Sequence, residues 1–170
     1  MNKINIIILI VGLLNVILGF VVLAKNKKNP SNFWFFIMCL FGGGWGVMKA
    51  VQLSVLDVEM HDLWIARIMM LGVIVAPVAY FIFSHYFPYK LKEFSKEKIF
   101  LLFLAPIAMV ILTLFGIFTY TENSIVSGNL HREIIFGEFL IFSIYFFVYI
   151  VLGLNILLKK HRLSEGINKE

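Results

Sequence analysis

The stretch INIIILIVGLLNVILGFVVLA, residues 4–24, decides the class of this protein. It contains no charged residue, and 21 residues form a helix about 31 Å long, which is enough to cross the hydrocarbon core of a bilayer. A signal peptide has a shorter apolar region of about 7–15 residues. The stretch therefore predicts a transmembrane helix and not a cleaved leader.

Four further apolar blocks follow the first one. The whole chain of 170 residues is 61% hydrophobic, with a mean hydropathy of +0.92. The blocks are unbroken runs without the alternation of barrel strands, so the sequence predicts an all-α fold, a polytopic helical bundle with five transmembrane helices. Pro77 and Pro106 lie inside two blocks and predict kinks, because neighbouring helices can satisfy the carbonyl that a proline frees. The predicted spans are residues 4–24, 33–56, 63–87, 99–120 and 136–158.

Basic residues are distributed unevenly between the connecting segments. Eleven of them lie between alternate blocks or after the last block, whereas the opposite side has only Lys3 and Arg132. The positive-inside rule then places the N-terminus outside and the C-terminus in the cytoplasm. The net charge of +5 reflects this topology and does not predict nucleic-acid binding. The eleven residues are Lys25, Lys27, Lys28, Lys90, Lys92, Lys96, Lys98, Lys159, Lys160, Arg162 and Lys169.

Two basic residues fall inside predicted spans, Lys49 and Arg67. Both lie near the outer ends, where they can extend toward water or pair with acidic groups such as Asp62 and Glu138. One interpretation is structural ion pairing. The other is an outward-facing pocket for an anionic or peptide ligand, because helical spacing puts aromatic and polar side chains beside the two cations. The candidate residues are Trp45, Lys49, Gln52, Asp62, Trp64, Arg67 and Glu138.

Small residues recur at a spacing of four in FGGGWGVMKA. Gly42, Gly46 and Ala50 would form one stripe and predict close helix packing, with a hinge as the alternative interpretation. Cys39 is the single cysteine, which excludes an intrachain disulfide. No cofactor or metal site is expected, since His61 and His131 lie on separate loops.

Three longer stretches resemble the N-terminal seven-transmembrane sensor region of bacterial histidine kinases. They are NPSNFWFFIMCLFGGGWGV, LWIARIMMLGVIVAPVAYFIFSHYFP and LLKKHRLSEGINKE, and the likeness lies in their aromatics, prolines and loop charges. The resemblance implies a membrane sensor with its N-terminus outside, and it places a sixth span soon after residue 170. Residues 1–158 are thus expected to be a membrane sensor domain, and residues 159–170 a cytoplasmic basic tail or truncated inner loop, with Gly166 as a helix breaker.

The resemblance favours a sensor or receptor module without catalysis of its own. The kinase catalytic domain is not part of these 170 residues, and His161 does not lie in a phosphoacceptor pattern. The alternative is a complete small polytopic protein, such as a transporter or permease subunit, although few polar residues lie near the midplane of the spans. The expected location is the bacterial cytoplasmic membrane. The expected partners are the lipid bilayer, an outer anionic or peptide ligand and a second copy in a homodimer.

Overall fold

The computed structural model describes the main chain over residues 3–52, 54, 61–90, 96–115, 121–126, 129–134 and 136–167. Side chains are described over residues 3–51, 54, 70–90, 97, 100–115 and 140–164. These residues form five helices and one hairpin. The elements are α1 (Lys3–Lys25), α2 (Pro30–Gln52), α3 (His61–Tyr86), α4 (Lys96–Leu114), β1 (Thr121–Val126), β2 (Asn129–Ile134) and α5 (Phe136–Ile167).

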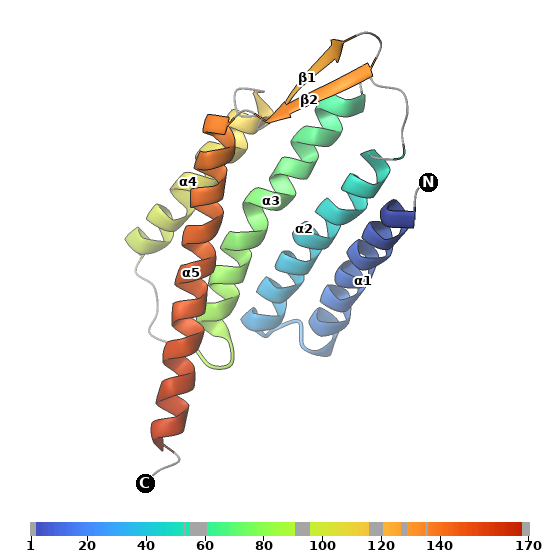
Figure 1. Cartoon of the computed structure of the whole chain (residues 1–170). Helices are drawn as coiled ribbons and strands as arrows, with labels where there is room; N and C mark the ends of the chain where they lie inside the picture. The colour runs from blue at the N-terminus through green and yellow to red at the C-terminus, as the bar shows by residue number, and fades with distance from the viewer. Residues whose placement is uncertain are drawn as a thin grey trace.

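The helices stand side by side in an up-and-down arrangement (Figure 1). Helix α1 packs on α2, α2 packs on α3, and α3 packs on both α4 and α5. The connection between α1 and α2 lies at the same end of the bundle as the C-terminal ends of α3 and α5, and the hairpin lies at the opposite end (Figure 1). The basic segments that the sequence predicts on one side therefore share one end of the bundle.

The five helices coincide with the five predicted apolar blocks. Their described apolar segments differ in length from one helix to another. Among the described residues, three segments are long and apolar enough to cross a membrane: Lys3–Lys25, Pro30–Val51 and Leu140–Ser164. The described apolar parts of the other two helices are shorter, at Met70–Tyr86 and Phe100–Leu114. The chain is a membrane helical bundle, and five crossings remain a prediction.

The backbone adds one element and corrects one expectation. The fold is a helical bundle as predicted, and β1 and β2 form one additional antiparallel hairpin, from Thr121 opposite Ile134 to Val126 opposite Asn129. Residues 159–167 are not a loop but the last turns of α5. A glycine within a helix costs only about 1 kcal/mol relative to alanine, so Gly166 does not end the helix. The strands were missed because they are short and largely polar.

The core lies along α3, at positions three or four residues apart. Met70, Ile74, Val78, Phe81 and Ile82 are buried there, and they pack with buried residues of α4 and α5. This spacing gives one helix face, which contacts both neighbours. Those neighbouring residues are Met109 on α4 and Tyr145 and Tyr149 on α5.

Small residues allow α1 and α2 to approach closely, as the sequence predicts, but one member of the predicted stripe is wrong. Gly46 and Ala50 are buried, whereas Gly42 is exposed and a Cβ there would meet nothing within 4 Å. The close contact is made instead by Gly43, where a Cβ would lie 2.7 Å from the main-chain oxygen of Gly12. The seam is shifted because its direction depends on where α1 crosses α2.

Candidate functional site

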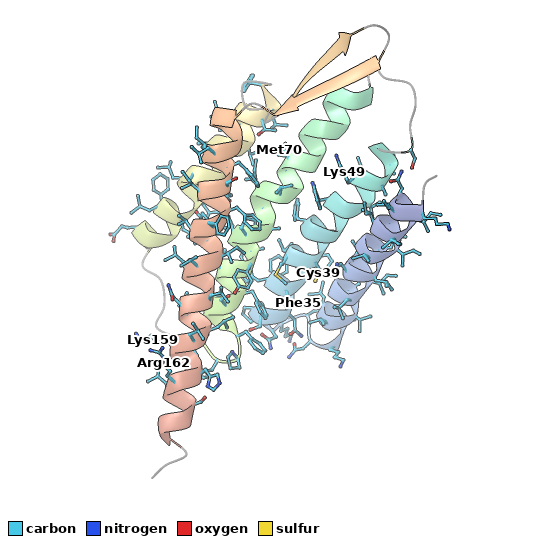
Figure 2. The ribbon with its side chains drawn as sticks, viewed as in Figure 1. Phe35, Cys39, Lys49, Met70, Lys159 and Arg162 are labelled. Atoms are coloured by element: carbon cyan, nitrogen blue, oxygen red, sulfur yellow. The ribbon has the colours of Figure 1, made fainter. Side chains whose placement is uncertain are left out.

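The predicted outer group is described in part. Lys49 is half-buried near the end of α2, and Trp45 is 39% exposed one turn earlier. A Cβ at Gly72 of α3 would lie 3.4 Å from Cβ of Trp45, so the base of this side chain faces α3. Figure 2 shows Lys49 on α2 near the hairpin end of the bundle.

The rest of that group lies outside the described side chains. This applies to Gln52, Asp62, Trp64, Arg67 and Glu138. Their helices place the end of α2 and the starts of α3 and α5 at the same end of the bundle (Figure 1). The predicted cluster around Lys49 and Arg67 therefore stays a prediction.

The candidate site whose side chains are described lies on α5. Two tyrosines of α5 donate hydrogen bonds to the main chain of α3 and α4, the two helices that contain a proline. Pro106 has no N–H, so the carbonyl of Leu102 lacks its helical donor. The hydroxyl of Tyr149 donates a hydrogen bond to this oxygen at 2.5 Å. The hydroxyl of Tyr145 donates to the carbonyl of Ile74, at 2.6 Å, in the turn before Pro77. Both helices continue through their prolines, as the sequence predicts.

Next along the same face of α5 is Gly153, which is buried. A Cβ at this position would lie 2.5 Å from Cε1 of Tyr80 and 3.1 Å from Oγ of Ser84. Any larger residue would require the Tyr80 ring, or α5 itself, to shift. Gly153 thus sets the separation of the two helices between the tyrosine pair and the end of α3.

Lys160 lies on the same face of α5 and makes the last contact between α5 and the end of α3. Its side chain is only 2% exposed. The Nζ atom donates to the carbonyl oxygens of Ser84 at 2.9 Å, His85 at 2.7 Å, Phe87 at 2.7 Å and Tyr89 at 2.6 Å. In return, the hydroxyl of Tyr89 donates to the main-chain oxygen of Lys160 at 3.1 Å, and Nζ lies 5.3 Å from the centre of the Tyr89 ring.

This lysine satisfies the C-terminus of α3. The last carbonyls of a helix have no helical donor, and they carry the negative end of the helix dipole. An ammonium group suits both needs, although its three N–H donors must be shared among four oxygens. Lys160 therefore joins the end of α3 to the end of α5 through hydrogen bonds.

The sequence predicts Lys160 only as one of the basic residues of the inner side. The available signal was helical phase, because Tyr145, Tyr149, Gly153 and Lys160 lie on one face of α5. Lys160 belongs to that face only if the helix extends beyond Leu158, where the predicted span ends. Because the tail was predicted as a loop or basic tail, Lys160 could not be distinguished from its neighbour Lys159.

Comparison with known protein families identifies a match over most of the chain. The family described as the N-terminal 7TM region of histidine kinase matches residues 7–170 of the chain. Comparison with curated proteins found no match. Comparison with solved structures found none either.

Proposed function

Because the chain belongs to the family of N-terminal 7TM regions of histidine kinases, we propose that it is a membrane sensor module that relays a signal to a kinase. The module performs no catalysis itself. It lies in the bacterial cytoplasmic membrane, with an anionic or peptide ligand bound at the outer ends of the helices. The expected outer cluster of Lys49, Arg67 and their acidic partners is the proposed contact for this ligand.

The observation that carries the proposal is the continuity of α5. The helix begins at Phe136 beside the hairpin and extends without a break to Ile167. Side-chain hydrogen bonds fix it to α3 at Ile74, to α4 at Leu102 and to the end of α3 through Lys160. A displacement of α5 at the hairpin end would therefore move the cytoplasmic ends of two helices together.

The test is ATP-dependent histidine phosphorylation of the complete gene product that contains this chain, in isolated membranes. The double variant Tyr145→Phe/Tyr149→Phe keeps both rings but removes the hydrogen bonds from α5 to Ile74 and Leu102. We expect the phosphorylation rate to change by at least about fivefold, the lower end of the range for coupling between sites. Tyr80→Phe is the matched control, because this ring lies at the same interface and, among the described residues, its hydroxyl makes no hydrogen bond.

Two results would contradict the proposal. One is an unchanged rate for a double variant that inserts at the wild-type level. The other is the absence of phosphohistidine from the gene product and from proteins that copurify with it. Altered solute uptake without phosphohistidine would favour the transporter or permease alternative.

We further propose five crossings with the N-terminus outside. The asymmetry of basic residues supports this orientation, as does the common end shared by the α1–α2 connection and the end of α5 (Figure 1). In a Cys39→Ser background, single cysteines at Asn26 and Ser164 should resist an impermeant thiol reagent in intact cells, whereas one at Ser127 should react. The reverse labelling pattern would invert the topology.

A further inference from the structure

A lateral groove separates α4 from α5, although both helices pack on α3. It encloses about 520 Å³, and its walls are apolar except for the two tyrosines. Leu101 of α4 is 65% exposed, and Ile141 and Val148 of α5 are 57% and 48% exposed. This α4–α5 groove is therefore open to the bilayer along its length. Its lining residues include Leu101, Ala105, Ile141, Tyr145, Val148 and Leu152.

The same face of α5 becomes basic toward its C-terminal end. Residues 145, 148, 152, 155, 159 and 162 follow a spacing of three and four, so they lie along one stripe. Lys159 and Arg162 line a second hollow of about 350 Å³ together with Asn155. Figure 2 shows both cationic side chains on one side of α5. No carboxylate lines this hollow among the side chains that the structure describes.

We propose that the α4–α5 groove and the Lys159–Arg162 pair together bind one anionic phospholipid of the cytoplasmic leaflet. The groove takes an acyl chain, and the two cations take the phosphate. Arginine can bind phosphate oxygens through two parallel hydrogen bonds, and basic pockets at the cytoplasmic ends of membrane helices suit anionic head groups. The proposal rests on the membrane orientation proposed above but not on signal sensing.

The dimensions support a phospholipid as the occupant. The helical rise to Lys159 from Tyr145, within the groove, is about 21 Å, and the groove continues beyond Tyr145 to Ile141. One leaflet, as half of a bilayer about 40–45 Å thick with its head groups, has about the same thickness. A packed transmembrane helix would fill the apolar part of the stripe equally well, but only an occupant with a negative group at the basic end would also match Lys159 and Arg162. The charge complementarity therefore favours an anionic lipid.

The neighbouring lysine is not part of this site. Lys160 is 2% exposed and bonded to the end of α3, whereas Lys159 and Arg162 are exposed. The two roles can be separated by substitution, since removal of the exposed pair leaves the α3–α5 contact unchanged.

The experiment measures retention of phosphatidylglycerol by the purified chain in detergent, by native mass spectrometry, with phosphatidylcholine as the competitor. Removal of two basic contacts in Lys159→Gln/Arg162→Gln should weaken the preference for phosphatidylglycerol about thirtyfold. The matched control is Lys27→Gln/Lys28→Gln, an exposed basic pair at the same end of the bundle. It should change the preference less than about twofold, because in the described part of the chain α1 and α2 do not pack on α5, and exposed charges far from the groove are screened by salt. The charge-conserving variant Lys159→Arg/Arg162→Lys should retain binding.

The groove has its own test. Leu152→Trp should reduce lipid retention while both cations remain, and soluble glycerol phosphate should not displace the lipid, because it has no acyl chain. Equal effects of the two glutamine variants would overturn the proposal, since the preference would then reflect overall charge. Wild-type retention by Leu152→Trp, together with disulfide-linked pairs of chains from Leu152→Cys, would assign the groove to a second copy.

Discussion

Replacement of Lys160 by methionine should break the contact between the C-terminal ends of α3 and α5. Methionine keeps an unbranched side chain but cannot donate to the four carbonyl oxygens that Nζ contacts. Unsatisfied buried acceptors cost about 1–3 kcal/mol each, and water entering at the helix end reduces the total. We expect a loss of about 3 kcal/mol in the free energy of unfolding, as the combined result of these opposing effects.

The measurement is thermal unfolding of the purified protein in detergent, combined with hydrogen exchange of the segment that follows α3. Lys159→Met is the matched control, because it makes the same change one residue away on an exposed side chain. The control should have nearly wild-type stability. Equal melting temperatures for the two variants would show that the contacts of Lys160 contribute little to stability.

Replacement of Gly43 by leucine should separate α1 from α2. A Cβ at this position would lie 2.7 Å from the oxygen of Gly12 and 3.0 Å from Cβ of Asn15. The first obstacle is main chain, so no side-chain rotation relieves it. Overpacking costs about 3 kcal/mol in such cases, while the better helix propensity of leucine returns somewhat less than 1 kcal/mol. The steric effect should dominate, with a net loss of about 2 kcal/mol.

Gly42→Leu is a control that differs by one position. A Cβ at Gly42 meets nothing within 4 Å, so this variant should be as stable as the wild type or slightly more stable. Both proteins would be compared by thermal unfolding in the same detergent. If Gly42→Leu were the destabilised variant, the originally predicted stripe of Gly42, Gly46 and Ala50 would be correct and the seam through Gly43 would be wrong.

The pairing of Lys49 and Arg67 in the predicted outer cluster cannot be derived from the sequence. Lys49 and Arg67 are conspicuous because charges inside apolar blocks are costly. Their pairing depends on the relative rotation of α2 and α3 about their axes, which no pattern within a single helix determines. Lys49 is described as half-buried, while the side chains of Asp62, Arg67 and Glu138 lie outside the described residues. The ion-pair and ligand interpretations of this group therefore both remain predictions.

The amino-acid sequence by itself determined the class of this protein, its family and the positions of its five helices. It did so because an apolar run of about 20 residues has few alternatives to a membrane helix, and because Pro77 and Pro106 are tolerated where neighbours satisfy the freed carbonyls. Only the tertiary structure decided which neighbour does this for Pro106. Tyr149 bonds Leu102, Gly43 rather than Gly42 faces α1, and Lys160 rather than Lys159 satisfies the end of α3. Each choice depends on the rotation and crossing of two helices, and a difference of one residue turns a side chain by about 100° around the helix axis.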